Sequence, residues 1–445
     1  MGGSMQAAKA ELAQDSVSDD VQGQALIRKI TWRLMPLIII CFFFAFFDRI
    51  NISFVKFQLE SELGFGNSVY GLGASLFVVG YVIFEVPSNL MLYKVGARRW
   101  IARIMMSWGI ATCAMVFVQT EWQFYVLRFL IGAMEAGFGP GVVFYLTLWF
   151  PSAFRGRATS HLFLASAFSG LIGAPLAGLL LEHMDNVFGL PGWHWLFLFG
   201  GVPCVVLGIV VLNVLCDRVE DAKWLTRAEK SWLAQKISEK NQSSSVEHSF
   251  RSALKSPILL LLGFLYFLIQ LGSHGLNFWA PHLIRSTGVE SSGTLGLLTA
   301  VPYVCGAIAM ITVGRLSDRS GERRKFVAGL LLLASIGFLL AGFFDDDTTL
   351  LVIALGVLGG GVIASIPAFW ALPPMILSGA AAAGGIALIN TLGQFGGIVS
   401  PLMVSQIIEF TGSATPALYV ISATSLLACL ILMFMLPDKL KHKDL

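Results

Sequence analysis

The stretch "LMPLIIICFFFAFFDRINISFVKF", residues 34–57, is the first of many apolar runs in this chain. It is longer than the roughly 20 residues that an α-helix needs to cross the hydrocarbon core of a membrane. Asp48 and Arg49 stand side by side within it, although each ionisable group costs about 2.5–3.5 kcal/mol at the centre of a membrane helix on insertion scales. The run predicts a transmembrane helix whose two charges need either partners or a function.

The composition of the whole chain indicates an all-α polytopic membrane protein. Of its 445 residues, 56% are hydrophobic and 13% are charged, and the mean hydropathy is +0.75, whereas soluble domains carry about 25% charged residues. Residues 1–4, ahead of Met5, are interpreted as a tag remnant and left out of the fold argument. Twelve apolar stretches, each long enough to span a bilayer, lie near 34–57, 70–93, 99–119, 122–149, 158–182, 193–215, 258–285, 292–315, 324–344, 348–371, 381–408 and 414–436.

The distribution of basic residues predicts the orientation. With twelve spans and the N-terminus inside, all but four of the 30 Lys and Arg residues fall on the same side. The four others are Arg49, Lys56, Arg128 and Arg285. Because cytoplasmic loops carry an excess of Lys and Arg, both termini are predicted to be cytoplasmic.

One long polar segment divides the chain into two halves. We predict an N-terminal tail at 1–33, a six-helix bundle at 34–215, a cytoplasmic linker at 216–257, a second six-helix bundle at 258–436 and a tail at 437–445. In the linker, apolar residues recur at helical spacing, which predicts an amphipathic helix on the membrane surface. The serine-rich residues 242–245 are interpreted as a flexible joint. Two bundles of six spans are typical of transporters with a binding site near the midplane.

Two loops carry related motifs at corresponding places in the halves. Between spans eight and nine stands "GRLSDRSGERRK", residues 314–325, and between spans two and three stands "NLMLYKVGARRW", residues 89–100. The pattern resembles the signature cytoplasmic loop of the major facilitator superfamily, which implies the major facilitator fold. The resemblance implies a conformational or gating role for the loop residues Gly314, Asp318, Arg319, Gly321, Arg98 and, after span four, Arg155.

Several further stretches resemble the anion:cation symporter branch of that family, roughly from residue 32 to 437. They are "FDRINISF", "RFLIGAMEAGFGPGVVFYLTLWFP", "RGRA", "GLNFWAP" and "FWALPP" followed by "AAAAGGIALINTLGQFGGIVSP". The bacterial phthalate, tartrate, 4-hydroxyphenylacetate and galactonate-type permeases look most similar. The resemblance implies a bacterial inner-membrane protein that imports a small organic acid anion, aromatic or a hydroxy or sugar carboxylate, together with protons. It would be driven by the proton gradient, with no cofactor.

The charged residues in spans one and four are the candidates for coupling. Arg128 and Glu135 are seven residues apart, which places them on one face of a helix. In the galactonate-type relatives the matching Asp and Glu carry protons and the arginines govern coupling or substrate approach. The resemblance therefore implies proton coupling by Asp48 and Glu135 and substrate binding by Arg49 and Arg128. A purely structural ion pair between helices remains the alternative.

Polar and aromatic residues near the midplane are candidates for the substrate pocket. Tyr81, Trp370 and Asn390 match binding residues of the galactonate-type members. His274 stands where relatives commonly have Tyr, and either a packing role or a contact with a carboxylate is open to it. Glu85 is expected to form a structural ion pair with the loop that contains Arg155 and Arg157.

Other classes of protein find little support. The chain has no phosphate-binding Gly-Lys-Ser/Thr loop, and its six cysteines and seven histidines show no spacing of metal ligands or of a nucleophilic enzyme. We therefore expect no enzyme activity, no metal and no nucleic-acid partner, and a monomer that works in the lipid bilayer. The rival is a proton-coupled exporter or antiporter of organic compounds, because "SGLIGAPLAGLL" at 169–180 partly resembles a drug-antiporter motif.

Overall fold

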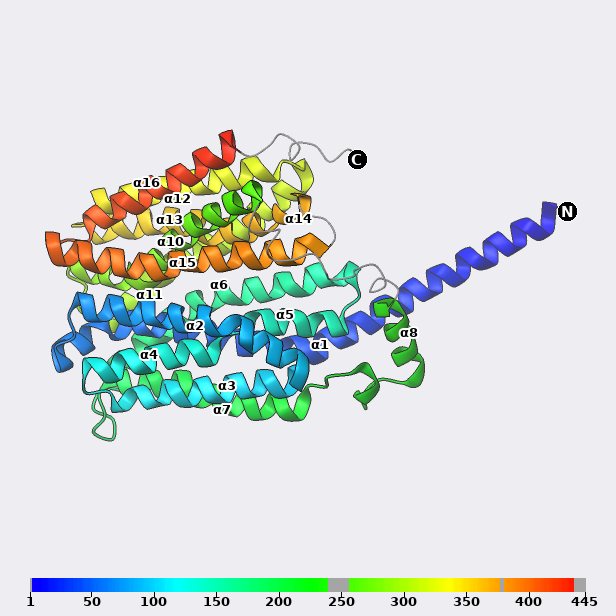
Figure 1. Cartoon of the computed structure of the whole chain (residues 1–445), viewed down its shortest axis with the longest axis horizontal. Coiled ribbons are helices and arrows are strands. Elements are labelled where there is room, and N and C mark those ends of the chain that lie inside the picture. Colours follow the sequence, from blue (N-terminus) through cyan, green and yellow to red (C-terminus); the bar gives the residue numbers. More distant parts are fainter. Residues whose placement is uncertain (1, 239–255, 377–379, 436–445) are drawn as a thin grey trace.

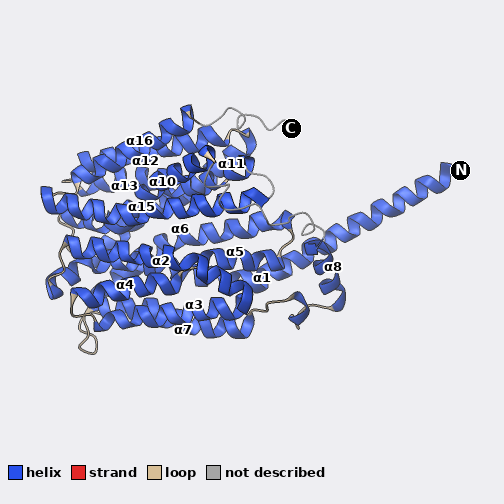
Figure 2. Ribbon diagram, viewed as in Figure 1, coloured by secondary structure: helices blue, strands red, loops and turns tan. Residues whose placement is uncertain are grey.

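The computed structural model describes residues 2–238, 256–376 and 380–435. The expected serine-rich joint at 242–245 and the tail at 437–445 lie outside these residues. Within the described chain every regular element is a helix, and twelve helical segments are long and apolar enough to cross a membrane (Figure 2). The prediction of an all-α, twelve-span protein is confirmed.

The helices follow the predicted apolar runs, with three irregularities. The third span ends in a short 3-10 helix, the fourth is broken into α4 and α5, and the eleventh is preceded by the one-turn α14. The elements are α1 Gly2–Leu63, α2 Asn67–Val95, α3 Ala97–Ala114, η1 Met115–Phe117, α4 Glu121–Glu135, α5 Phe138–Trp149, α6 Ser152–His183, α7 Gly192–Val214, η2 Val219–Asp221, α8 Arg227–Ser238, α10 Pro257–Ser286, α11 Ser292–Ser320, α12 Arg323–Phe343, α13 Thr348–Trp370, α14 Pro373–Ile376, α15 Ala380–Thr411 and α16 Thr415–Phe434.

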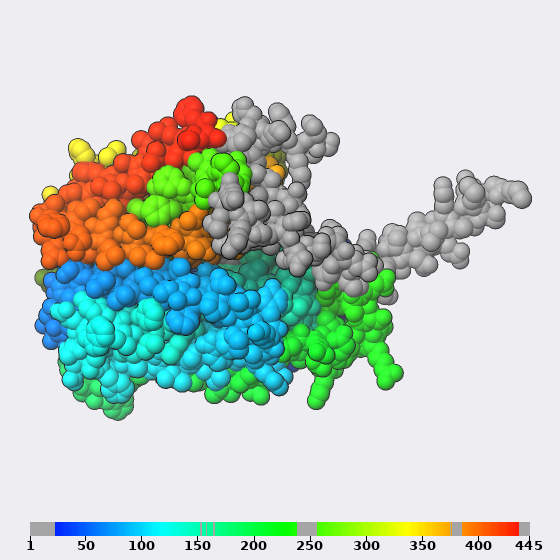
Figure 3. Space-filling model, viewed as in Figure 1, coloured from blue at the N-terminus to red at the C-terminus, as the bar shows by residue number. Residues whose placement is uncertain are grey.

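The two halves of the chain pack internally in the same way. In the first half, α2 packs on α4 and α3 on α7; in the second, α11 packs on α13 and α12 on α16. Across the boundary, α2 contacts α15 and α6 contacts α11. The halves lie side by side (Figures 1 and 3). This pairing is the geometry of two repeated bundles that meet at a central interface.

The first helix begins well before the predicted span. The expected tail at 1–33 is not a separate segment, because α1 runs without interruption from Gly2. Leu26 and Ile30 of this extension are buried in the protein. A run free of Pro and Gly from Gln24 to Met35 permits the helix to continue. The apolar run that begins at residue 34 therefore did not indicate where the helix starts.

The linker packs on this extension through α8. Lys29 Nζ lies 2.8 Å from Glu229 Oε1, and the ring of Trp232 lies against Gly23. Partial burial opposes ionisation of Glu229, but the hydrogen bonds from Lys29 and the Thr226 amide hold its pKa below the usual value. Leu233 is fully buried. At least part of the apolar face of α8 therefore covers protein and not lipid.

The bundles are joined at the end opposite the termini. There the Tyr70 hydroxyl donates to the Phe278 carbonyl (2.8 Å), and the Gly293 amide donates to Glu182 Oε2 (2.5 Å). Near the other end, a cavity of ≈ 490 Å³ lies between the halves, lined by α6, α11 and α13. We call the first region the far end and the second the termini end.

Candidate substrate and proton site

The fourth span is broken beside its acidic residue. α4 ends at Glu135, Ala136 is extended, and Gly137 has φ +84° before α5 starts at Phe138. A side chain at Gly137 would be strained in this left-handed conformation, and its Cβ would lie 2.5 Å from Ser88 Oγ. The fourth span is therefore interrupted at this glycine, and Glu135 lies at a helix end.

An ion pair joins spans one and four at this break. Arg49 Nε and Nη2 lie 2.8 and 2.5 Å from the same oxygen, Oε1 of Glu135. Glu135 is fully buried, whereas the Arg49 side chain is 31% exposed. Among the described residues, the second oxygen of Glu135 has no hydrogen-bond partner. The arginine is thus accessible while the acid it neutralises is not.

Aromatic rings hold the Arg49 guanidinium in place. Its Cζ lies 5.1 Å from the centre of the Tyr81 ring, 5.4 Å from Phe46 and 5.6 Å from Phe77. Such cation–π contacts are worth about 0.5–2 kcal/mol each. Close packing of α2 on α4 makes this possible, because Gly132 contacts the backbone of Phe77 directly.

Asp48 faces a different part of the same bundle. It is 3% exposed, and its Oδ2 has no partner in the described chain. A Cβ added at Gly200 of α7 would lie 3.5 Å from Asp48 Oδ1 and 2.9 Å from Asn51 Nδ2. Asp48 therefore points towards α7 and Arg49 towards α4, as expected for neighbours about 100° apart on a helix.

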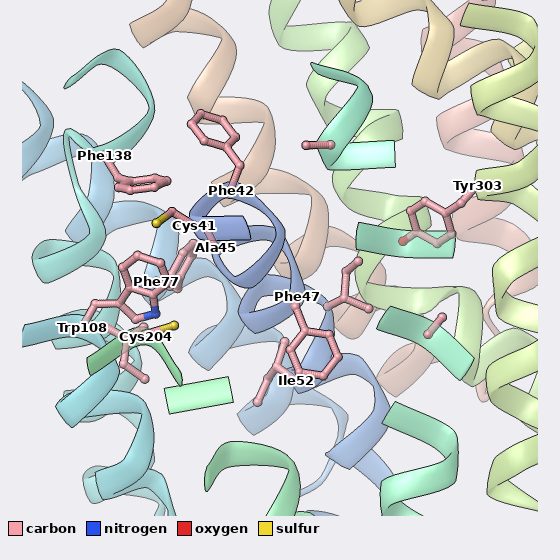
Figure 4. Packing of buried hydrophobic residues seen from close by; sticks show 14 of the residues in the cluster. Cys41, Phe42, Ala45, Phe47, Ile52, Phe77, Trp108, Phe138, Cys204 and Tyr303 are labelled. Atoms are coloured by element: carbon pink, nitrogen blue, oxygen red, sulfur yellow. The ribbon is translucent and has the colours of Figure 1, made fainter. Parts of the chain in front are cut away.

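Arg128 is the fourth ionisable group and is also buried. Its Cζ lies 4.8 Å from the centre of the Phe77 ring, and its Nε donates to the Gly73 carbonyl at 3.4 Å. Nη2 has no partner within the described residues. Phe77 therefore lies under both arginines. Figure 4 shows Phe77, Trp108 and Phe138 around α1 in the apolar packing that encloses this charged group.

The expected pocket residues of the second half lie on α10, α13 and α15. Trp370 packs edge-on against Tyr266, with ring centres 5.0 Å apart. His274 Nδ1 lies 3.0 Å from the Gln270 carbonyl of its own helix. Asn390 donates from Nδ2 to Glu85 Oε1 at 3.1 Å. The first half thus contributes the charges and the second mainly neutral polar and aromatic groups.

The expected pairing of Glu85 with the loop after span four is not found for Arg155, whose side chain has other partners. Arg155 donates to the carbonyls of Phe150 and Thr147 at 2.8 and 3.1 Å, and the side chain of Arg157 is not described. Carbonyls at the end of a helix lack intrahelical partners, so Arg155 satisfies the end of α5. The partner of Glu85 is Asn390, in the opposite bundle.

The residues of the two loop motifs lie at the ends of helices and form contacts there. Gly321 (φ +71°) ends α11, Asp318 lies 3.5 Å from Arg323, and Arg319 and Gly314 are exposed. In the first half, the Arg98 amide donates to Asp217 Oδ1 (2.8 Å) and its Nε to the Leu212 carbonyl (2.6 Å). The acid missing from the first motif is thus supplied by the start of the linker.

A further cross-bundle contact that the sequence analysis did not predict involves Lys56. Lys56, which was counted among the charges left over, is 1% exposed and lies 3.1 Å from His282 Nδ1 across the far end. The rings of Phe57 and Trp279 are 5.3 and 5.5 Å from its Nζ. In the sequence, the only sign of this contact was a lysine one residue from the end of an apolar run. Among the described residues, no group of His, Cys, Asp and Glu could hold a metal ion.

The family model and the similar proteins identify the class as membrane transport proteins. The chain belongs to the Major Facilitator Superfamily, whose family model matches residues 38–292 and 263–444. An Agrobacterium vitis protein provisionally named a tartrate transporter is 42% identical, covering 93% of this chain and 92% of that protein. A Pseudomonas putida protein provisionally named as the metabolite transport protein NicT is 39% identical (94% and 96%), and a quinolone resistance transporter of Acinetobacter baumannii is 38% identical (94% and 96%).

Solved structures support the same fold. The partially occluded, inward-open xylose transporter XylE of Escherichia coli superposes with a TM-score of 0.71 at 15% identity, covering 94% of this chain and 100% of that one. An inward-facing bacterial homologue of the human lysosomal transporter Spinster gives 0.68 at 17% identity (93% and 96%). The chain is a multi-pass secondary transporter and not an enzyme.

Proposed function

We propose that this transporter imports a small organic acid anion together with protons, by alternating access. The observation that carries the proposal is the Arg49–Glu135 pair, in which a partly exposed guanidinium neutralises a fully buried carboxylate. An anion that reaches the space between the bundles meets the arginine and not the acid. The pair can therefore exchange one negative partner for another.

The exchange couples substrate to proton. When a substrate carboxylate binds the Arg49 guanidinium, Glu135 loses its counter-charge while its own side chain stays buried. A desolvated, unpaired carboxylate favours its neutral form, so Glu135 takes up a proton. Binding of substrate and binding of proton then reinforce each other, and by linkage the effect is reciprocal. Release of the substrate lets Arg49 re-pair with Glu135 and discharges the proton.

Asp48 offers a second protonatable group. It is buried, and its Oδ2 has no hydrogen-bond partner among the described residues, so proton binding there removes the cost of a buried charge. Two protons carried with one monoanion make import electrogenic. Moving one net charge through 100 mV is worth about 2.3 kcal/mol, which is roughly a 50-fold accumulation of substrate.

The relatives support the substrate class. The name of the Agrobacterium vitis relative refers to tartrate, a small hydroxy acid, and the intramembrane arginines suit an anion. We further propose an orientation with both termini in the cytoplasm of a bacterial inner membrane, from the excess of Lys and Arg. The joined far end and the cavity at the termini end then correspond to an inward-facing state. We propose a monomer without cofactor.

The test is the internal pH of proteoliposomes when single carboxylic acids are added outside, corrected with protein-free vesicles. We expect acidification by at least one acid, which Glu135→Gln and Asp48→Asn abolish. Because a neutral side chain at 135 mimics the protonated acid, substrate exchange at equal pH is expected to persist in Glu135→Gln. Full proton-driven uptake in both variants would refute the coupling scheme.

The quinolone resistance transporter among the relatives favours one competing function, proton-coupled export. In that case a fluoroquinolone added to acid-loaded vesicles drives protons outwards, and the acids tested above have no effect. Asp48 and Glu135 then bind proton and drug alternately. The direction of proton movement separates the two functions in one assay.

A further inference from the structure

Glu85 is an intramembrane carboxylate that the coupling scheme leaves unused. It lies on α2, is 7% exposed, and accepts one hydrogen bond from Asn390. Among the described residues no cationic side chain lies within ion-pair distance of it. An ionised carboxylate has about four acceptor positions. Glu85 lies between the bundles and can accept further hydrogen bonds. It is therefore a candidate ligand contact, because intramembrane acids are functional by default.

Its position relative to Arg49 follows from the helix. Tyr81 and Glu85 are four residues apart on α2, hence on the same face and about 6 Å apart along the axis. The Arg49 guanidinium lies over the Tyr81 ring at 5.1 Å. The Arg49 guanidinium therefore lies against Tyr81, and the Glu85 carboxylate is carried one helical turn further along α2.

The opposite wall comes from the second bundle. Asn390 reaches Glu85 from α15, and one turn further along α15 Gly393 lies against the ring of Tyr266. Tyr266 in turn packs on Trp370. A molecule bound between Arg49 and Glu85 would thus have an amide and aromatic rings opposite it.

We infer that Glu85, with Asn390, recognises a hydrogen-bond donor on the substrate, a hydroxyl or a protonated amine, while the substrate carboxylate binds Arg49. The inference deepens the proposed symport and rests on it. Glu85 accepts the donor with the oxygen capacity that Asn390 leaves free, and it repels a second carboxylate at that place. The site therefore selects acids with a donor a short distance from the carboxylate over equally sized acids without one.

The experiment compares acids that differ in one group. Succinate, malate and aspartate carry H, OH and NH₃⁺ at the same carbon. Benzoate, 4-hydroxybenzoate and 4-(aminomethyl)benzoate carry H, OH and CH₂NH₃⁺ at the same ring carbon. Binding is measured as thermal stabilisation of the purified full chain, and transport as uptake into proteoliposomes. The variants are Glu85→Gln and, as a matched control, Glu409→Gln, whose side chain is exposed on α15.

In the unmodified protein, a donor-bearing acid of at least one series is expected to bind about tenfold tighter than its parent, because a charged acceptor strengthens the bond. Glu85→Gln removes roughly that factor, and Glu409→Gln leaves it unchanged. Comparison of the hydroxyl-bearing and ammonium-bearing acids shows which donor Glu85 recognises. An equal loss for all acids in Glu85→Gln, or no preference in the unmodified protein, overturns the inference.

The design separates this inference from the proposed symport. Donor selectivity that depends on Glu85 without any proton movement would keep the recognition site and refute proton coupling. Proton-coupled uptake with unaltered selectivity in Glu85→Gln would support proton coupling and refute the recognition of a donor by Glu85. If none of the six acids binds or is transported, both are refuted.

Discussion

The break in the fourth span depends on one glycine, and Gly137→Ala tests it. At φ +84° an alanine costs about 1–2 kcal/mol in backbone energy. Its Cβ would also lie 2.5 Å from Ser88 Oγ and 2.9 Å from Ser88 Cβ, and such overpacking costs about 1–3 kcal/mol. The substitution is therefore expected to destabilise the protein by about 2–5 kcal/mol.

Gly139→Ala is the matched control, two residues along in the same motif. A Cβ there would meet only the Tyr81 hydroxyl, at 3.9 Å, so we expect a change within about 0.5 kcal/mol. Both variants would be unfolded by titration with SDS in mixed micelles, followed by tryptophan fluorescence. Proton-driven uptake would be measured on the same preparations, because the break also holds Glu135 against Arg49. A Gly137→Ala protein as stable and as active as Gly139→Ala would refute the account of the break.

Two further predictions concern the two ends of the molecule. Tyr70→Phe removes a hydrogen bond to the Phe278 carbonyl worth about 0.5–1.5 kcal/mol. Spin-label distances across the far end should show that the population of molecules open at that end rises roughly two- to thirteen-fold. The control Tyr93→Phe, at an exposed position, should leave these distances unchanged. The pKa of Glu229 is lowered in the folded protein, so its contact with Lys29 stabilises the docked α8 above the unfolded-state pKa near 4.5. This stabilisation is lost as the pH falls through the lower pKa of the folded protein. Protease cleavage of the linker should rise in that pH range, and this pH dependence should be absent in Glu229→Gln.

The sequence was sufficient for the membrane architecture because hydropathy is a local property. Each apolar run reports its own span, and the fold follows from their number and from the related loop motifs. The start of α1 could not be found in this way, since the extension before residue 34 is polar on one side and buries Leu26 and Ile30 against protein. Hydropathy measures partition into lipid, and that helix packs on protein.

Partners across the bundles were beyond local reasoning. Glu85 and Asn390 are 305 residues apart, and nothing in either segment specifies the other. Charge complementarity favoured the loop with Arg155 and Arg157 as the partner of Glu85, but Arg155 donates to the carbonyls of Phe150 and Thr147 at the end of α5. In a polytopic protein each charge has several candidate partners of opposite sign, and only the packing of helices selects one.

The distribution of charge across the interface gives the two halves different parts in the proposed cycle. Asp48, Arg49, Arg128 and Glu135 all belong to spans one and four, within one bundle. Their mutual distances therefore need not change when the bundles move relative to each other, so a proton can be kept throughout the transition. The contact between Glu85 and Asn390 does cross the interface, so a movement of one bundle relative to the other can break it. A substrate donor bound to Glu85 would compensate for that loss only while the substrate is bound, which links recognition of the substrate to movement of the bundles.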